Sequence, residues 1–161
     1  EKGLMKPARI GRNQKSQRDS LIRGDWISWI DDWNAHEALK NYHGFLTLLQ
    51  QKLCKDLHLS LKYFEKHFAF YPKGTYYKRH LDQHRDSLHR QITTIYYLSP
   101  WEKNNGGQLV LYPQGKAPVH IDPIAGRLVC FLSGRLEHEV LLTHAPRVSI
   151  SGWFRDDTQL F

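Results

Sequence analysis

The chain has 161 residues, of which 40% are hydrophobic and 12% aromatic, and its net charge is +7. This length predicts a single domain over residues 1–161, and the composition excludes a disordered chain. No apolar run approaches the roughly 20 residues of a membrane-spanning helix, so a protein that crosses a membrane in that way is excluded.

The net charge bears on the binding partners, and the two cysteines bear on metal binding and on the redox setting. Basic proteins often bind nucleic acid or acidic partners, but the basic residues are scattered, so a basic protein with no nucleic acid partner is expected. Cys54 and Cys130 form no C-x-x-C pair, so a structural zinc site is not expected. Both lie in apolar runs, which predicts buried free thiols in a reducing, cytoplasmic setting.

A loop, a short strand and a helix are predicted in the first part of the chain. Residues 8–24 are polar and basic, which is typical of a mobile loop. Alternation over residues 26–31 indicates a short strand. Asn34 followed by Glu37 resembles a capping box. Apolar residues then recur at helical spacing, so residues 35–58 are predicted to form one amphipathic helix.

Short strand-like runs follow one another from residue 62 onward. They are rich in aromatic and β-branched residues and are separated by turn signals such as Pro72-Lys73-Gly74. Six to eight strands at this rhythm predict a β-core over residues 62–155, arranged as a sandwich or jelly roll. The expected fold is mainly β, with the helix packed outside the core.

Three spacings point to a metal site. His80-Leu81-Asp82 is an H-x-D triplet, His138 follows 58 positions later (138 − 80 = 58), and Arg147 nine positions after that (147 − 138 = 9). Strand residues two apart point to the same face, so His80 and Asp82 can hold one ion between them. Two histidines and one carboxylate are the ligands of a facial-triad Fe(II) oxygenase. An arginine fork suits a carboxylate of a dicarboxylate cosubstrate.

The H-x-D triplet by itself is a weak signal. A chain with ten histidines contains one by chance about as often as not, and His84-Arg85-Asp86 is a second example. His80 can instead be an ordinary histidine that is hydrogen-bonded to a carboxylate. The order of triplet, distal histidine and arginine favours a metal site, but spacing alone leaves the choice of triplet open.

Several segments resemble the prolyl 4-hydroxylase superfamily of Fe(II)/2-oxoglutarate dioxygenases. They are YPKGTYYKRHLD (71–82), ITTIYYLSPWEKNNGGQLVLYPQG (92–115), GRLVCFLSGRLEHEVL (126–141) and PRVSISGWF (146–154). The segment IRGDWISWID (22–31) is most like the oxygen-sensing prolyl hydroxylases that act on hypoxia-inducible factor. The resemblance covers most of residues 8–157, and the compact chain looks like a bacterial relative.

The resemblance implies a double-stranded β-helix and an enzyme that uses Fe(II), 2-oxoglutarate and O2, with ascorbate as the reductant. The implied reaction is hydroxylation of a prolyl residue of a protein at C4, with succinate and CO2 as co-products. Elongation factor Tu is a bacterial protein substrate implied in the same way. A cytoplasmic monomer is expected.

The resemblance also assigns the metal and cosubstrate residues. Tyr77 stands three residues before His80, as in the family pattern, and no tyrosine precedes His84 in this way, so the first triplet is selected. The matched iron ligands are His80, Asp82 and His138. The matched 2-oxoglutarate residues are Arg147 and Tyr97 at the distal carboxylate and Tyr71 near the metal-bound end.

The substrate side is matched less closely. Tyr77, Arg90 and Trp153 match positions that line the pocket for the substrate proline. Asp25 resembles an aspartate that pairs with the equivalent of Arg90. Residues 10–24 resemble a finger loop that folds over the bound peptide, and closure of such a lid excludes water.

Two departures from the family concern this substrate side. The turn between Tyr71 and His80 is one residue shorter than in the animal enzymes, and residues 83–90 differ. Substrate contacts there, including that of Arg90, are the ones affected, whereas the three matched ligands are not.

Two alternative functions are considered. A nucleic-acid demethylase with the same cofactors would fit the positive charge, but that family generally places a second arginine six positions after the anchor, where this chain has Trp153. A non-catalytic β-helix that grips a partner with the basic loop is the other alternative. The intact set of two histidines and one aspartate argues against it.

Overall fold

Two antiparallel sheets and one long helix make up the part of the chain that the structure, a computed structural model, describes: residues 5–8, 22–83 and 88–158. The helices are η2 (Trp33–Ala35), α1 (Glu37–Leu57) and η3 (Lys103–Asn105). The strands are β1 (Lys6–Pro7), β2 (Trp26–Trp29), β3 (Tyr63–Tyr71), β4 (Tyr77–His80), β5 (Arg90–Tyr97), β6 (Leu109–Tyr112), β7 (Val119–Ile121), β8 (Leu128–Leu132), β9 (Glu137–Val140) and β10 (Arg147–Arg155).

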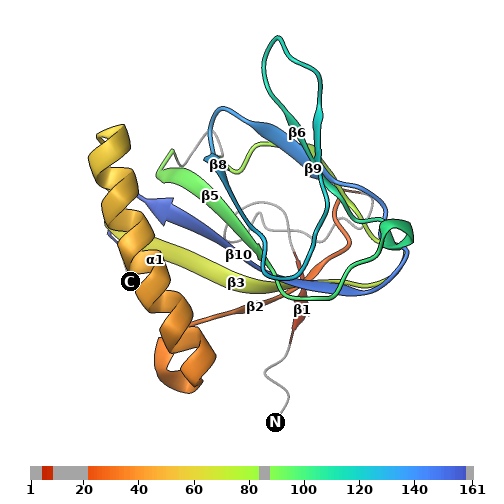
Figure 1. The fold of residues 1–161 in the computed structure, drawn as a ribbon, viewed down its shortest axis with the longest axis horizontal. Coiled ribbons are helices and arrows are strands. Elements are labelled where there is room, and N and C mark those ends of the chain that lie inside the picture. The colour runs from red at the N-terminus through yellow and green to blue at the C-terminus, as the bar shows by residue number, and fades with distance from the viewer. Residues whose placement is uncertain (1–4, 9–21, 84–87, 159–161) are drawn as a thin grey trace.

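The larger sheet has six strands in the order β1-β2-β3-β10-β5-β8, and the smaller has four in the order β4-β9-β6-β7. The long strands β3, β5 and β10 form the centre of the larger sheet, where β10 pairs with β3 on one side and with β5 on the other. In Figure 1 the helix α1 lies along one side of this sheet, and β6 and β9 lie on the other. The three layers therefore place the smaller sheet opposite the helix.

The main core lies between the two sheets. Alternate residues of the long strands point inward, because strand side chains alternate between the two faces. The buried residues of this core are Ala69, Tyr71, Ile95, Tyr97, Leu109, Leu111, Val129, Phe131 and Val140. Tyr71, Tyr97 and, among its half-buried neighbours, Tyr77 belong to this inner layer, so the predicted site residues line the inside of the sandwich.

A second core lies between the larger sheet and α1. Leu46 of the helix packs with Ile92 of β5 and Phe154 of β10, which are the outward-facing neighbours of the inner-layer residues. Burial of such side chains contributes roughly 1.5–3 kcal/mol each. The predicted supporting helix is confirmed, and it fixes the long strands that carry the site.

The start of α1 differs from the prediction. The predicted capping box of Asn34 and Glu37 is wrong, because His36 is the N-cap and its Nδ1 accepts a hydrogen bond from the amide of Ala38. Asn34 lies in η2, where its own amide donates to the side chain of Asp32. The chain therefore passes through a short 3-10 turn before the α-helix begins.

Some side chains that were predicted to be buried lie on the surface. Phe45 and Leu57 of the predicted apolar helix face are 50% and 48% exposed. Cys130 is exposed and Cys54 is half-buried, so the prediction of a buried thiol is wrong for Cys130. In β8, Cys130 points away from the inner core that holds Val129 and Phe131.

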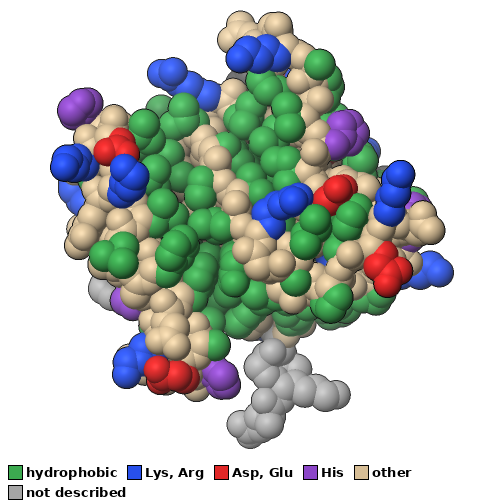
Figure 2. Space-filling view, in the orientation of Figure 1, with side chains coloured by type: hydrophobic (Ala, Val, Ile, Leu, Met, Phe, Trp, Pro, Cys, Tyr) green, Lys and Arg blue, Asp and Glu red, His purple; other side chains and the backbone are tan. Residues whose placement is uncertain are grey.

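The face of the molecule that Figure 2 shows, in the orientation of Figure 1, has hydrophobic side chains gathered between α1 and the strands β6 and β9. Of the helices described, none is long and apolar enough to cross a bilayer.

Candidate active site

The H-x-D triplet lies where β4 ends. His80 is the last residue of β4, and Asp82 follows two positions later. His80 pairs in register with His138 on the neighbouring strand β9. The smaller sheet therefore brings the distal histidine beside the triplet, although the two are 58 residues apart in the chain (138 − 80 = 58).

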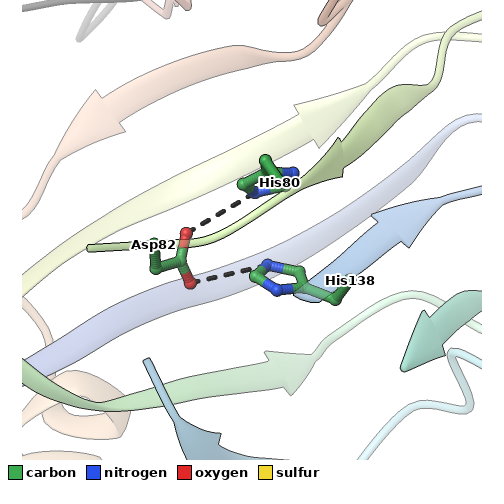
Figure 3. A group of neighbouring side chains, drawn as sticks. All are labelled: His80, Asp82 and His138. Atoms are coloured by element: carbon green, nitrogen blue, oxygen red, sulfur yellow. Dashed lines mark ion pairs between the residues drawn. The ribbon is translucent and has the colours of Figure 1, made fainter. Parts of the chain in front are cut away.

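These three side chains converge on one point. The Nε2 atoms of His80 and His138 lie 3.5 Å from Oδ1 and Oδ2 of Asp82, respectively. One ligand atom from each residue lies within 4.8 Å of the others. Figure 3 shows both rings directed at the carboxylate from adjacent strands. Two imidazole nitrogens and a carboxylate oxygen at this spacing fit a divalent transition metal ion.

The hydrogen bonds of the two rings select the form that binds a metal. Nδ1 of His80 lies 2.7 Å from the carbonyl oxygen of Lys78, and Nδ1 of His138 lies 3.2 Å from that of Leu136. A carbonyl oxygen can only accept, so Nδ1 carries the proton in each ring. The neutral ring then has a free lone pair on Nε2, which faces Asp82.

The electrostatics of the cluster agree with this arrangement. Burial raises the pKa of Asp82, but the facing His138 and His80 lower it more, so the pKa lies well below its usual value. Burial lowers the pKa of His138, against the opposing effect of Asp82. An ionised carboxylate beside two imidazole nitrogens is the donor set that a cation requires.

A second polar cluster surrounds Arg147, the first residue of β10. Its guanidinium lies over the ring of Tyr71, 4.4 Å from the centroid, and 5.4 Å from that of Tyr97. Nε and Nη1 of Arg147 and the hydroxyl of Tyr97 are buried and have no hydrogen-bond partner among the described residues. A buried donor without a partner costs about 1–3 kcal/mol, and more when charged. An anionic ligand with acceptor oxygens would satisfy these groups.

The same strands carry both clusters. Tyr97 and Thr93 lie on the inner side of β5, opposite Ser149 and Trp153 of β10. Thr93 contacts Asp82, and Tyr97 contacts Arg147. The two strand positions are four residues apart, a separation of about 13 Å. The site therefore has a metal end and an anion end, fixed to one rigid sheet.

The comparisons with known proteins agree with this geometry. The family model described as the 2OG-Fe(II) oxygenase superfamily matches residues 66–155. This chain belongs to that superfamily. Membership implies Fe(II), 2-oxoglutarate and O2, and the donor sets at the two ends of the site fit a divalent ion and a carboxylate.

Two relatives are similar to this chain over most of its length. Egl nine homolog 1 of Homo sapiens is 35% identical over 155 residues, which are 89% of this chain and 35% of that protein. The hypoxia-inducible factor prolyl hydroxylase of Caenorhabditis elegans is 32% identical over 181 residues, which are 99% of this chain and 24% of that protein. The chain therefore spans about a third or less of the length of these two relatives.

Two solved structures have the same fold. The prolyl-4-hydroxylase of Pseudomonas putida matches with a TM-score of 0.82 and 41% identity, over 86% of this chain and 75% of that one. The Trichoplax adhaerens prolyl hydroxylase, solved with a peptide of the hypoxia inducible factor oxygen degradation domain, matches with a TM-score of 0.81 and 35% identity, over 91% and 69%. The predicted double-stranded β-helix is confirmed.

The remaining predicted residues of this oxygenase lie beside the metal end. Tyr77 stacks on His80, with ring centroids 3.6 Å apart. The guanidinium of Arg90 lies 3.6 Å from the centroid of the Trp153 ring, and its Nη1 is 3.4 Å from the carbonyl oxygen of Asp82. Flat aromatic and guanidinium surfaces therefore border the cluster of His80, Asp82 and His138.

The predicted pairing of Asp25 with Arg90 is wrong. Asp25 receives two hydrogen bonds from Arg23, at 2.8 and 2.6 Å. Arg90 donates to Glu65 at 2.5 and 3.2 Å, and Arg155 donates to the same carboxylate at 2.7 Å. Arg23 is only two positions from Asp25 in the chain, and Glu65 lies across β10 from Arg90, so each group has a nearer partner.

Two predictions fall on residues that are not described. Residues 9–21 hold most of the predicted lid, and residues 84–87 hold the competing triplet with His84. The end of the lid segment is described. The amide of Lys78 donates to the carbonyl oxygen of Ile22 at 2.9 Å, and the backbones of Arg23 and Tyr77 form an isolated antiparallel β-bridge. These contacts tie the segment to β4 beside the metal end.

Sequence reasoning missed four residues that support the site. Thr93 and Ser133 hold Asp82, Glu65 holds Arg90, and Gly107 makes room for Arg147. A Cβ atom at Gly107 would come within 3.0 Å of Nε of Arg147 and 2.8 Å of Cγ2 of Thr143, at a positive φ of +69°. In the sequence, the adjacent glycines at 106 and 107 indicate only a turn between two strands, and no pattern links them to Arg147.

One other group of metal-type ligands does not fit a metal. His89, Asp156 and Asp157 lie close together at the surface. Gln91 donates to Asp156 at 2.8 Å, and Arg155 donates to both oxygens of Asp157 at 2.8 Å. These carboxylates are already satisfied by the side chains of Gln91 and Arg155, and the group lies nearer the surface than the buried cluster around Asp82.

Proposed function

We propose that this chain is a protein prolyl hydroxylase that binds Fe(II) through His80, Asp82 and His138 and oxidises a prolyl residue at C4. The observation that carries the proposal is the convergence of two Nε2 atoms and one buried carboxylate, in a chain similar to enzymes that are named prolyl hydroxylases. Bound iron, with 2-oxoglutarate and O2, supplies the oxidising chemistry that inserts one oxygen atom and yields succinate and CO2.

The anion end of the site would bind the cosubstrate. Arg147 offers two unpartnered nitrogens, and the Tyr97 hydroxyl is a third unpartnered group beside it. A guanidinium binds a carboxylate through two parallel hydrogen bonds, which suits the distal carboxylate of 2-oxoglutarate. Tyr71, stacked under the guanidinium, would border the cosubstrate between this carboxylate and the metal.

The substrate proline would lie against Tyr77 and Trp153. Tyr77 stacks on the ligand His80, and Trp153 is buried beneath Arg90. These surfaces are apolar and flat, so they can orient a proline ring toward the metal and keep water away from it. Asp25 would act indirectly, because it holds Arg23 over the ring of Tyr77, 4.4 Å from the ring centroid.

Several finer assignments belong to the same proposal. Ascorbate would keep the iron reduced, the enzyme would act as a cytoplasmic monomer, and elongation factor Tu is a protein substrate to test first. The Trichoplax structure is a complex with a peptide fragment of the hypoxia inducible factor oxygen degradation domain, which supports a peptide ligand for this chain as well.

The test measures both products of the reaction. The protein is incubated with Fe(II), ascorbate, 2-oxoglutarate and elongation factor Tu or its proline-containing peptides, and prolines are screened for a gain of about 16 Da, one oxygen atom. The proposal expects a modified proline and an equal amount of succinate with wild type, and neither with His80→Ala. Succinate without any hydroxyproline in a panel of bacterial proteins would contradict the prolyl assignment.

A further inference from the structure

We propose that the buried hydroxyl pair Thr93–Ser133 is a positioning device that holds the Asp82 carboxylate in the orientation in which it binds the metal. This inference rests on the proposed metal site of His80, Asp82 and His138. It concerns two residues that do not contact the metal themselves and act through a ligand.

The contacts form a short chain of hydroxyl groups. Oγ1 of Thr93 donates to Oδ2 of Asp82 at 2.8 Å, and Oγ of Ser133 lies 2.8 Å from Oγ1 of Thr93. Thr93 is 1% exposed and Ser133 0%. Water cannot replace either hydroxyl at this burial, so loss of Thr93 removes the hydroxyl that donates to Asp82, and loss of Ser133 removes the hydroxyl that orients Thr93.

A count of protons fixes the direction of both hydrogen bonds. Oγ1 of Thr93 is the donor to Oδ2 of Asp82, because a carboxylate that holds a metal ion accepts hydrogen bonds and donates none. Thr93 has one hydroxyl proton, and that proton goes to Asp82. Ser133 must therefore donate to Thr93. Each hydroxyl is oriented by the next, and the series ends on the metal ligand.

The need for such a device follows from where Asp82 lies. His80 and His138 are held by paired strands, β4 and β9. Asp82 lies beyond the last residue of β4 and belongs to neither sheet. Thr93, by contrast, is in the middle of β5, paired with Phe131 of β8 and with Trp153 of β10. The hydroxyl pair thus transfers the rigidity of the larger sheet to the one ligand outside a strand.

Ser133 is anchored just as firmly. It follows the end of β8, and its amide donates to the carbonyl oxygen of Gln91 at 3.0 Å. Its position is therefore set by β5, the same strand that carries Thr93. Groups that hydrogen-bond a metal ligand fix its orientation, and their removal typically costs about 10–100-fold in metal affinity.

A matched control lies next to Thr93. Thr94 is also fully buried, and its hydroxyl donates to the carbonyl oxygen of Gly152 at 3.3 Å. It points to the opposite face of β5, toward α1. Thr94→Val removes a buried hydroxyl of the same kind without touching Asp82, so it measures the general effect of this substitution.

The test is calorimetric titration of the metal-free protein with Mn²⁺, a redox-stable divalent probe. Thr93→Val is expected to weaken Mn²⁺ binding by about 10–100-fold relative to Thr94→Val. Thr93→Ser, which keeps a hydroxyl, is expected to restore most of the affinity. Ser133→Ala is expected to weaken binding less, by about three- to tenfold. The variant that combines Thr93→Val with Ser133→Ala is expected to bind Mn²⁺ as weakly as Thr93→Val alone, because Ser133 acts through Thr93.

The same titrations separate failure of this inference from failure of the metal site. Binding by wild type with loss in His80→Ala supports the metal site. If Thr93→Val then binds Mn²⁺ within about twofold of Thr94→Val, the positioning role is overturned and the metal site stands. A wild-type protein that binds no Mn²⁺ overturns both. If Thr93→Val does not fold, Ser133→Ala decides: binding equal to that of wild type overturns the inference.

Discussion

The two ends of the site differ in how their polar groups are satisfied. At the metal end, both histidines bond to backbone carbonyls, and Asp82 contacts both rings and Thr93. At the anion end, Arg147 and Tyr97 bury donors that have no partner among the described residues. The metal end is thus organised before any ligand binds, whereas the anion end is completed only by one.

This difference teaches that the anion end, unlike the metal end, lowers the stability of the ligand-free protein. A preorganised ligand set keeps its geometry at little further cost, but an unpaired buried cation lowers the stability of the free protein. We therefore expect removal of the Arg147 charge to stabilise the ligand-free protein, and removal of a metal ligand to abolish activity. The predictions below separate these effects, from the largest to the smallest.

The largest effect is expected at the metal ligands. His80→Ala or Asp82→Ala should lower succinate formation by at least about 100-fold, more than the loss caused by changing groups that only support a ligand. His84→Ala, from the competing triplet, is the matched control and should stay close to wild type. Loss of turnover in His84→Ala together with retention in His80→Ala would show that the wrong triplet was chosen.

Arg147→Met breaks the anion end. Removing one side of a buried, charged hydrogen-bonded pair costs about 2–5 kcal/mol, so binding of 2-oxoglutarate should weaken by about 30-fold or more. The same variant should melt about 2–4 °C higher than wild type without ligand, for a gain of about 1 kcal/mol. Equilibrium titration and thermal unfolding measure the two effects. A variant that is destabilised and still binds 2-oxoglutarate would contradict the contrast between the ends.

A third prediction concerns acid stability. His67 is buried between Trp29 and Trp153, and burial lowers its pKa to about 4, with a smaller contribution from Arg23 in the same direction. Because the folded pKa lies below the unfolded value, stability is present above about pH 6.5 and is lost as pH falls toward 4. From pH 7 to pH 5 this group alone should cost about 2 kcal/mol.

Urea unfolding at the two pH values checks this effect. His67→Met should lose less stability than wild type between pH 7 and pH 5, by about 2 kcal/mol. His120→Gln, at an exposed position of β7, is the control and should follow wild type. Equal pH dependence of wild type and His67→Met would refute the role of His67. Arg23, Asp25, Arg90 and Glu65 are the charged groups that act on this ring.

The smallest effect is expected where Glu65 holds Arg90 against Trp153. Glu65→Gln keeps the shape but weakens the hydrogen bonds to Arg90 and Arg155, each worth about 1 kcal/mol. The KM for a peptide substrate should rise about three- to tenfold, with kcat and Mn²⁺ affinity close to wild type. A change in Mn²⁺ affinity as large as that of Thr93→Val would mean that Glu65 supports the metal end instead.

Much of this arrangement was predictable because it depends on local pattern. The H-x-D spacing at the end of a strand predicted that His80 and Asp82 lie close together. The order of triplet, later histidine and arginine, with the family resemblance, predicted the roles of His138 and Arg147. The helix and the β-core were predicted from periodicity. The boundaries of these elements were less predictable. The helix α1 begins at Glu37 and not at residue 35, because His36 caps α1 and Asp32 caps the preceding turn η2.

The supporting contacts were not predictable from one sequence. Glu65 meets Arg90 across β10, 25 positions apart, and Thr93 meets Ser133 40 positions apart. Such pairs depend on strand register, which hydrophobic alternation fixes only as inward or outward. The wrong pairing of Asp25 with Arg90 has the same cause. A resemblance transfers residue types, but it does not give the distances across the sheet that decide whether Asp25 or Glu65 lies beside Arg90.

Crystallography of the protein grown with Mn²⁺ and 2-oxoglutarate tests the central claim most directly. The account predicts anomalous density bonded to Nε2 of His80, Nε2 of His138 and one oxygen of Asp82. It also predicts that the distal carboxylate of 2-oxoglutarate lies on Arg147 and Tyr97, and that Thr93 still donates to Asp82. Density at His89, Asp156 and Asp157 instead, or a cosubstrate that leaves Arg147 unpaired, would contradict it.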